Sequence, residues 1–344
     1  MIINKLKLEN FTVFEDQQIE FEPGINVLIG ENGTGKTHIL KVLYSACQSV
    51  DQKVSFPHKL VLTMLPDDYK ISRLLTRKPG NRTGIIRIVA SEAERAPERV
   101  LKASFNGKTK KWEADVTGEG GWEESFPGLS SIFIPAKEIL SNSYNLNAAV
   151  EKNNVRFDDT YLDIINAAKV DISVGRNSDS KNAMLRRIQQ MTHGTVVYDT
   201  KRDEFYLKNG SSRQEFNLVA EGIRKMALLW QLVKNGTLEK GSILFWDEPE
   251  ANINPTYISV IVEMLLELQR QGVQIFISTH DYMIASYFEV KKQKEDRVIF
   301  HSLSHAEGTD VIYYDKSKTF DNLKNNVIIT AFNNLLNEIY DLGV

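Results

Sequence analysis

A glycine-rich loop near the start of the chain has the residue types and the spacing that phosphate binding requires. Gly30, Gly35, Lys36 and Thr37 satisfy the pattern G-x-x-x-x-G-K-[ST], in which glycines let backbone N–H groups turn inward onto phosphate oxygens. In such a loop the lysine reaches the β- and γ-phosphates of a nucleotide and the threonine hydroxyl holds Mg²⁺. The candidate phosphate-binding residues are Gly30, Glu31, Asn32, Gly33, Thr34, Gly35, Lys36 and Thr37.

Two adjacent carboxylates follow an apolar run much later in the chain. Residues 242–246 predict a buried strand, and Asp247 and Glu248 come directly after it. Consecutive side chains at a strand end point to opposite sides, so one carboxylate can hold the metal while the other polarises an attacking water. We assign Asp247 to Mg²⁺ and Glu248 to the catalytic base. Such a pair on its own is more often a solvated turn, but the phosphate-binding loop favours the catalytic interpretation.

A histidine follows a third apolar run. Residues 275–279 predict a buried strand, and His280 comes next. The carboxyl ends of parallel strands meet at the ligand-binding edge of an α/β sheet, so we expect His280 to reach the γ-phosphate beside Lys36 and Glu248. A lone histidine at a strand end is usually a hydrogen-bonded surface residue. Its order and spacing after Asp247 favour the catalytic role here.

The elements that must position these residues follow from the periodicity of the apolar side chains. Residues 25–29 predict a buried strand immediately before the loop, and 38–44 predict a helix immediately after it. Residues 50–135 predict strands and loops, with a glycine-rich turn at 118–121, and 137–192 predict helices. The remaining expected elements are a hairpin at 196–207, helices at 223–232, 256–271 and 326–341, and strands at 273–278 and near 297–314.

This succession predicts an α/β fold with a mixed sheet, an antiparallel N-terminal lobe and a helical insertion. We expect a first lobe with the phosphate-binding loop at 1–136 and the helical insertion at 137–194. A second lobe at 195–344 would carry the carboxylates and the histidine.

Composition narrows the class of protein. The 344 residues include 42 Lys and Arg against 45 Asp and Glu, a formal charge of −3, so any polyanion site must be a local patch. The single Cys47 excludes a disulfide framework and a multi-cysteine zinc site and fits a reducing cytoplasm. Lys5, Lys7 and Glu9 interrupt the first apolar residues, and no later run approaches the length of a spanning helix. We therefore expect a cytoplasmic protein without direct membrane contact.

Together these motifs resemble the ATPase heads of the SMC/RecF/OLD group, a branch of ABC-type P-loop ATPases that mostly serves DNA rather than transport. The N-terminal run 6–11 and the segment 24–37 are similar to the group's opening. Asp247-Glu-Pro-Glu250 with Asn254-Pro255 resembles an OLD-like Walker B motif and D-loop, and Ser278-Thr-His280 resembles the switch histidine. The resemblance implies a P-loop NTPase of ABC-ATPase type that uses ATP and Mg²⁺ and works as a homodimer with ATP sandwiched between two heads.

Two departures from the group concern the partner-facing side of such a site. In the signature segment 218–225, Ala220 stands where the group has a serine that caps the partner's γ-phosphate. The candidate nucleotide contacts there are Ala220, Glu221 and Gly222, with capture by backbone N–H groups and the helix start. Arg224 or Lys225 could compensate, or could lie on a solvated helix face. For the Q-loop, 135–138 is the best positional candidate.

The partners remain open among several alternatives. The segment after His280 has no Asp-x-Asp pair, so a built-in Toprim nuclease is not expected. We expect nucleic acid, DNA or RNA, as a partner, or a separate effector such as a nuclease or toxin in phage (antiviral) defence. The alternatives are an ABC transporter ATPase subunit and a nucleotide-binding module with little hydrolysis. Candidate polyanion contacts are Arg73, Arg77, Lys78 and Arg82, then Lys108, Lys110 and Lys111 beside Trp112, and Arg186 with Arg187.

Overall fold

The computed structural model describes residues 1–152, 155–172, 177–306, 308–309 and 311–341. Within these ranges the chain forms a five-stranded sheet, a six-stranded sheet and a small three-stranded sheet. Parts of the predicted insertion (153–154 and 173–176) and of the second lobe (307, 310 and 342–344) lie outside the described residues.

The five-stranded sheet is antiparallel throughout and has the order β2-β1-β4-β5-β6. Its residues alternate between buried and solvent-facing positions, because only one face is packed against the core. Its strands are β1 (Ile2–Phe11), β2 (Phe14–Glu20), β4 (Thr83–Ser91), β5 (Arg99–Asn106) and β6 (Asp115–Thr117).

The six-stranded sheet has the order β14-β13-β3-β12-β11-β7 and is parallel except for β14. Its central strands are apolar and buried on both faces, as parallel strands covered by helices must be. The strands are β3 (Ile25–Gly30), β7 (Ser131–Ile134), β11 (Ile243–Asp247), β12 (Gln274–Thr279), β13 (Val298–His305) and β14 (Ile312–Ser317). The mixed sheet and the antiparallel N-terminal sheet predicted from sequence are confirmed.

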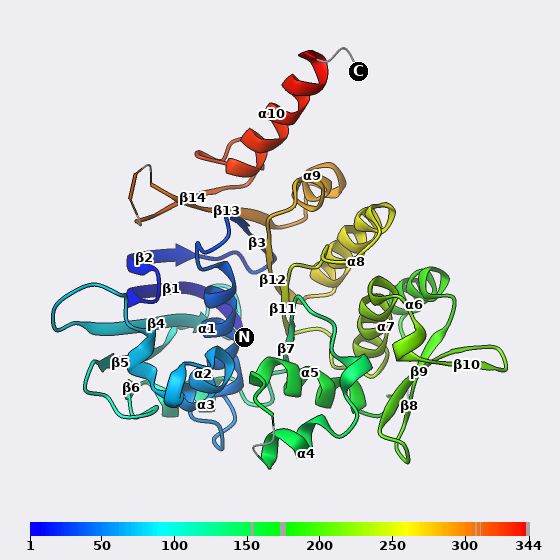
Figure 1. Ribbon diagram of the computed structural model, residues 1–344, viewed down its shortest axis with the longest axis horizontal. Helices are drawn as coiled ribbons and strands as arrows, with labels where there is room; N and C mark the ends of the chain where they lie inside the picture. Colours follow the sequence, from blue (N-terminus) through cyan, green and yellow to red (C-terminus); the bar gives the residue numbers. More distant parts are fainter. Residues whose placement is uncertain (153–154, 173–176, 307, 310, 342–344) are drawn as a thin grey trace.

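Helices cover both faces of this central sheet (Figure 1). Helix α1 (Lys36–Gln48) lies between the two large sheets, where its Leu40 and Leu43 join Phe245 of β11 in one core cluster. Helices α7 (Glu221–Lys234), α8 (Ile258–Arg270) and α9 (Tyr282–Lys291) contribute to the cluster on the opposite face. This arrangement fixes the start of α1 at the edge where the parallel strands end.

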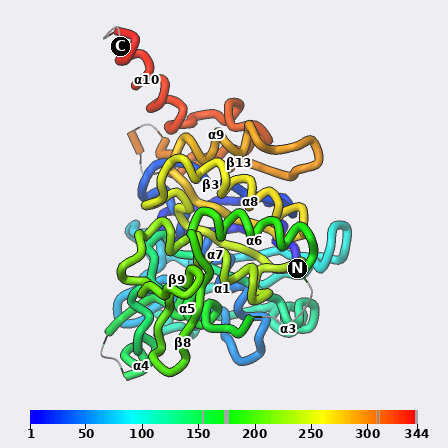
Figure 2. The backbone as a smooth tube through the Cα atoms, turned by 90° about the vertical axis from the view of Figure 1, so that its right-hand side faces the viewer, coloured from blue at the N-terminus to red at the C-terminus, as the bar shows by residue number. Residues whose placement is uncertain are grey.

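The remaining helices are peripheral. Both views show α10 (Val327–Asp341) projecting away from the rest of the chain (Figures 1 and 2). The others are α2 (Phe56–Met64), α3 (Glu119–Ser125), α4 (Leu146–Glu151), α5 (Asp159–Lys169) and α6 (Asp179–Thr192), with the three-stranded sheet formed by β8 (Thr195–Asp199), β9 (Glu204–Asn209) and β10 (Ser212–Glu215). Short 3₁₀ turns span Asp67–Tyr69, Ile71–Leu74, Leu140–Asn142, Phe216–Leu218 and Pro255–Tyr257. Of the helices in the described ranges, none has the length and apolar character needed to cross a membrane.

The expectation that residues 50–135 contain only strands and loops is wrong at two places. Helix α2 begins after Ser55 with a proline in its first turn, and it buries Phe56, Leu60 and Val61 on one face. The predicted turn at 118–121 is a turn only at its first residue, because α3 begins at Glu119. Gly118 has φ 92°, and Trp122 of the new helix is buried against α1 through a hydrogen bond to the Ala46 carbonyl.

Candidate active site

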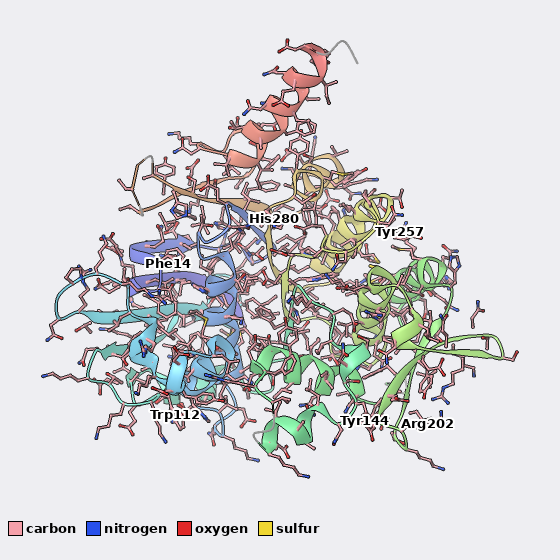
Figure 3. The ribbon with its side chains drawn as sticks, viewed as in Figure 1. Phe14, Trp112, Tyr144, Arg202, Tyr257 and His280 are labelled. Atoms are coloured by element: carbon pink, nitrogen blue, oxygen red, sulfur yellow. The ribbon has the colours of Figure 1, made fainter. Side chains whose placement is uncertain are left out.

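Three adjacent parallel strands end at one edge of the central sheet. Strand β12 lies between β3 and β11, and the register places Thr279 opposite Ile29 and Ser278 opposite Asp247. The phosphate-binding loop therefore follows β3 at the same edge where the carboxylates follow β11. Figure 3 shows His280 at the end of β12, where the chain turns into α9. The structure thus brings together the residues predicted from three distant segments.

The loop conformation depends on glycine at its two ends. Gly30 has φ 145°, and a Cβ there would lie 1.8 Å from the Leu303 carbonyl oxygen. Gly35 has φ 89°, and a Cβ there would lie 2.5 Å from the ring of Phe14 and 2.8 Å from Val13. Sequence reasoning missed this packing of the β1–β2 turn against the loop, because nothing in the sequence pairs Phe14 with Gly35.

The lysine of the loop reaches back over the loop itself. Lys36 Nζ donates hydrogen bonds of 2.7 Å to the carbonyl oxygens of Gly30 and Glu31. The side chain is buried, and burial lowers its pKa although the charges of Glu248 and Asp247 oppose the shift. The ammonium group is thus held within the loop, in a position from which phosphate oxygens could replace the two carbonyls as acceptors.

A hydroxyl and a carboxylate meet beside the loop. Thr37 Oγ1 lies 3.1 Å from both carboxylate oxygens of Asp247, and the Ser278 hydroxyl also donates to Asp247. Burial raises the pKa of Asp247, and the hydrogen bonds from Ser278 and Thr37 partly oppose that rise. In the described ranges, no group of three or more His, Cys, Asp or Glu side chains is placed to hold a metal ion. A hydroxyl and one carboxylate fit Mg²⁺, which usually takes one or two protein ligands and completes its shell with phosphates and water.

The second carboxylate, that of Glu248, lies beside His280. Glu248 has φ 47°, a left-handed conformation that is uncommon outside glycine and is typical of functional sites. Its Oε1 lies 3.4 Å from His280 Nδ1, and both side chains are partly exposed at the mouth of the site. Glu248 and Asp247 therefore contact different groups: Glu248 lies beside His280, and Asp247 accepts from the hydroxyls of Thr37 and Ser278. This fits the expectation that consecutive side chains at a strand end point to opposite sides.

The signature segment forms the start of α7. Ala220 is the exposed N-cap residue, and its side chain makes no capping hydrogen bond to the helix. A Cβ on Gly222 would lie 2.7 Å from the Asn252 carbonyl oxygen, so this helix start is packed closely against the loop after Glu248. Lys225 is 1% exposed and donates to the Ala251 carbonyl, and burial lowers its pKa. The interpretation of Lys225 as part of a solvated helix face is wrong.

Arg224 is also engaged within the subunit. Its Nε donates to Glu138 Oε2 at 2.6 Å, and its Nη1 donates to the carbonyls of Phe216 and Val219. The Glu138 side chain is 0% exposed and that of Arg224 is 15% exposed. The segment proposed for the Q-loop is therefore joined to the signature segment by a buried ion pair. Sequence reasoning named both segments but gave no signal that they touch.

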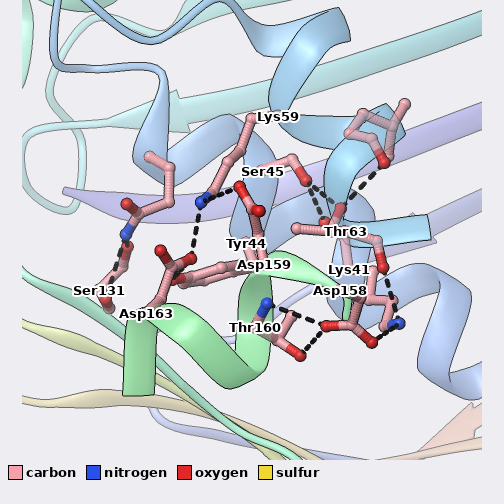
Figure 4. Close-up of polar contacts among 12 residues, drawn as sticks. Lys41, Tyr44, Ser45, Lys59, Thr63, Ser131, Asp158, Asp159, Thr160 and Asp163 are labelled. Carbon is pink, nitrogen blue, oxygen red and sulfur yellow. Dashed lines mark hydrogen bonds and ion pairs between the residues drawn. The ribbon is translucent and has the colours of Figure 1, made fainter. Parts of the chain in front are cut away.

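Helix α5 contributes contacts that the sequence did not reveal (Figure 4). Lys41 of α1 lies 3.0 Å from Asp158, and Lys59 of α2 lies 2.8 Å from Asp159 and 2.7 Å from Asp163. The Lys41 pair fastens the start of α5 to the helix that begins at the phosphate-binding loop, and the Lys59 pairs fasten it to α2. Burial raises the pKa of Tyr161 to about 12, and the charges of Asp158 and Asp247 add to the rise.

The predicted basic clusters do not gather on one side. Arg186 and Arg187 lie on α6, away from the five-stranded sheet, whereas the other clusters lie in the segments just before β4 and just after β5 (Figure 1). Two of these cations already have partners: Lys78 pairs with Glu15, and Arg187 with Glu263. The cluster on α6 is therefore separate from the other two.

Comparison with known proteins identifies relatives of the chain. Residues 25–286 match the family model described as "AAA domain, putative AbiEii toxin, Type IV TA system". A segment of 61 residues is 38% identical to the DNA replication and repair protein RecF of Limosilactobacillus reuteri. That segment is 18% of this chain and only 16% of the relative.

Solved structures of the same fold cover nearly the whole chain. The crystal structure of an SMC head bound to the C-winged helix domain of ScpA matches with a TM-score of 0.61 at 13% identity, over 92% of this chain and 98% of that one. The SMC head domain from Thermotoga maritima matches with a TM-score of 0.51 at 15% identity, over 92% and 99%. At such low identity the likeness establishes a shared fold.

Proposed function

This chain belongs to the family described as "AAA domain, putative AbiEii toxin, Type IV TA system" and is an ABC-type P-loop ATPase of the SMC/RecF group, and on this premise we propose that it is an ATP-driven dimerisation switch. Two copies bind ATP between them, and hydrolysis removes the terminal phosphate charge that joins them. The observation that carries the proposal is the contact of Thr37 with Asp247, because it assembles a magnesium site next to the lysine of the loop.

Each residue at the strand ends has one role in this proposal. Lys36 binds the β- and γ-phosphates, and Thr37 and Asp247 hold Mg²⁺, which neutralises phosphate charge when it is bound. Glu248 accepts a proton from the attacking water, since it is partly exposed and lies beside His280, whereas Asp247 contacts Thr37 and Ser278. His280, 3.4 Å from Glu248, donates a hydrogen bond to the γ-phosphate.

The start of α7 provides the surface for the partner's nucleotide. The helix is 14 residues long, and its N-cap residue, Ala220, leaves the first backbone N–H groups without a side-chain acceptor. Leu218, just before it, is 70% exposed. An uncapped helix start with an exposed N-cap residue is suited to a phosphate supplied by another molecule. Capture would rest on backbone N–H groups near Glu221 and Gly222, since Arg224 and Lys225 are engaged within the subunit.

The output of the switch is passed to a partner. We propose nucleic acid, DNA or RNA, or a separate effector such as a nuclease or toxin in phage defence, with the helical segment 137–194 as the part that responds. The ion pairs between α1, α2 and α5 support this route, because they tie that segment to the phosphate-binding loop. Copurification with a membrane permease would instead favour a transporter subunit.

Two variants test the switch. Glu248→Gln should still bind ATP but hydrolyse it about 10²–10⁴-fold more slowly, and it should remain dimeric with ATP and Mg²⁺ in light scattering after gel filtration. Lys36→Ala is the control that should lose nucleotide binding and stay monomeric. Equal hydrolysis in all three proteins would show a binding module with little chemistry, and a monomeric Glu248→Gln protein saturated with ATP would overturn the sandwich.

A further inference from the structure

The hydroxyl of Thr279 connects two loops of the candidate active site. Its Oγ1 donates a hydrogen bond of 2.6 Å to Glu250 Oε1 and accepts one of 3.0 Å from the backbone N–H of Asp281. Thr279 is the last residue of β12 and is fully buried, and Glu250 comes three residues after the end of β11. The loops that follow these two neighbouring strands are therefore joined through one buried side chain.

The bond from the Asp281 N–H to Thr279 closes a turn around His280. A hydroxyl that accepts from the backbone N–H two residues later restricts the conformation of the residue between them. Directly after this turn, the Asp281 side chain accepts a hydrogen bond from the Ile284 N–H and caps α9. The backbone of His280 is thus held between the end of β12 and the first turn of α9.

The ring of His280 depends on this backbone for its position. Its side chain is 50% exposed, so little packing restricts it. Its Nδ1 lies 3.4 Å from Glu248 Oε1, which is longer than an ordinary hydrogen bond. A histidine that must meet a γ-phosphate from so open a position needs a fixed main chain, because a misplacement of about 1 Å can cost about 10²-fold in rate.

Glu250 is a firm anchor for the threonine hydroxyl. It lies in a turn in which the Ala251 N–H donates to the Glu248 carbonyl and the Ile253 N–H donates to the Glu250 carbonyl. Lys225 of α7 donates to the Ala251 carbonyl of the same turn. Burial raises the pKa of the Glu250 carboxyl, and the hydrogen bond from the threonine hydroxyl opposes that rise because it favours the ionised form.

The carboxylate also decides the direction of the hydroxyl proton. An ionised carboxylate can only accept, so Thr279 donates to Glu250 and keeps its lone pairs for the Asp281 N–H. The second carboxylate oxygen, Oε2, is buried and has no hydrogen-bond partner among the residues that the structure describes. A buried oxygen without a partner costs free energy, which is a sign that Glu250 serves the site rather than the stability of the fold.

We propose that Glu250 and Thr279 are positioning residues that hold His280 in place to contact the γ-phosphate. Glu250 orients the Thr279 hydroxyl, and that hydroxyl fixes the turn on which His280 lies. Both residues act through His280 rather than on the nucleotide, so their loss changes the rate of hydrolysis more than the binding of ATP, which depends on Lys36 and its loop. The inference rests on the role of His280 in the proposed function and extends that role to two further residues.

ATP hydrolysis measured over a range of ATP concentrations tests the proposal. Thr279→Val keeps the shape of the side chain without its hydroxyl, and it should lower kcat about 10- to 10²-fold with little change in KM. Thr279→Ser restores the hydroxyl and should recover most of the loss. Glu250→Gln keeps an acceptor oxygen and should lower kcat less than Glu250→Ala. Equal losses in these two Glu250 variants would assign its charge a direct part in the chemistry and would overturn the positioning role.

A double variant with His280→Ala separates positioning from general damage to the fold. If the hydroxyl acts through the histidine, Thr279→Val should have no further effect on kcat once His280→Ala is present. Losses that multiply in the double variant would contradict the proposal, since damage to the fold acts with or without the ring. Thr192→Val is the matched control, because Thr192 is a buried threonine of α6 whose hydroxyl donates to the carbonyls of Ile188 and Gly194. It should leave kcat and KM unchanged.

Failure of the proposed function would give a different result. Unchanged hydrolysis in both Lys36→Ala and Glu248→Gln would overturn the ATP site and everything that depends on it. Unchanged hydrolysis in His280→Ala would overturn the role of the histidine, and the positioning role with it. A loss of kcat in His280→Ala without a loss in Thr279→Val would overturn the positioning role alone.

Discussion

The Thr37 hydroxyl lies 3.1 Å from each carboxylate oxygen of Asp247, across 210 positions of sequence. The contact joins the first turn of α1 to the end of β11. Strand β12, which lies between β3 and β11, supplies the Ser278 hydroxyl as a second donor to Asp247. A carboxylate in this position is buried and is held by two hydroxyl donors. Its protonation and its metal chemistry are therefore tied to each other.

Asp247→Asn should make the nucleotide-free protein more stable and should reduce hydrolysis by about 10²-fold or more, because it removes the carboxylate that we propose holds Mg²⁺. Burial raises the pKa of Asp247, so the folded state bears a penalty for the ionised form that is present at pH 7 and is relieved as the pH falls through the raised pKa. Urea denaturation at pH 7 should give a higher midpoint for the variant. A lower midpoint would mean that the hydrogen bonds from Thr37 and Ser278 outweigh burial.

Gly35→Ala should abolish nucleotide binding, while Gly33→Ala should weaken it less. Both glycines have positive φ, 89° and 83°, so both alanines bear similar backbone strain. Only the Cβ at position 35 meets another group, the Phe14 ring at 2.5 Å, whereas the Cβ at position 33 meets nothing within 4 Å. Calorimetric titration with a non-hydrolysable ATP analogue measures the difference. Equal losses in the two variants would show that backbone strain alone decides.

Arg224→Met should destabilise the protein by up to about 3 kcal/mol, the low end for a broken buried ion pair, because it removes the charged partner of the buried Glu138 carboxylate and leaves only hydrogen bonds from Ser141. Adding Glu138→Gln should recover part of that loss, since no uncompensated charge then remains. Urea denaturation of the two single variants and the double variant measures the coupling. Additive effects would show that the ion pair contributes little and that Arg224 acts through its bonds to the Phe216 and Val219 carbonyls.

Acid should weaken the fold partly through one histidine. His301 is fully buried between Tyr314 and Asn26, and burial lowers its pKa to about 3. The folded state keeps the ring neutral while the unfolded chain takes up a proton near pH 6.5, so stability is lost as the pH falls from 6.5 toward 3. The loss is about 1.4 kcal/mol per pH unit. His301→Gln should flatten the dependence measured by urea denaturation between pH 7 and 5, with the exposed His305→Gln as control, and an unchanged slope would refute this assignment.

Local patterns were sufficient to predict the strand-loop-helix unit around Lys36 and the strands before Asp247 and His280. Each of these depends on apolar runs of strand or helix length next to a motif with its own geometry, so the sequence contains the whole signal. Helix α2 was missed because Val61, Leu62 and Thr63 suit a strand as well as a helix, and only burial of Phe56 and Leu60 on one face decides.

The contacts that sequence reasoning missed are those between distant segments. Nothing in the sequence pairs Lys59 with Asp163 or Arg224 with Glu138, because tertiary register selects such partners. The neighbours across the five-stranded sheet are of the same kind: Lys7, Arg87 and Lys102 lie side by side only because of the register of three strands.

Gly222 and Lys225 pack against residues 251–252, so the start of α7 and the loop after Glu248 are coupled within one subunit. One of these loops follows the protein's own carboxylates, and the other begins the helix that we propose for the neighbouring subunit's nucleotide. A displacement at either loop is thus felt by the other within a single subunit. In a dimer of such subunits, each nucleotide would contact coupled segments of both subunits. Hydrolysis at one site would then change the rate of hydrolysis at the other.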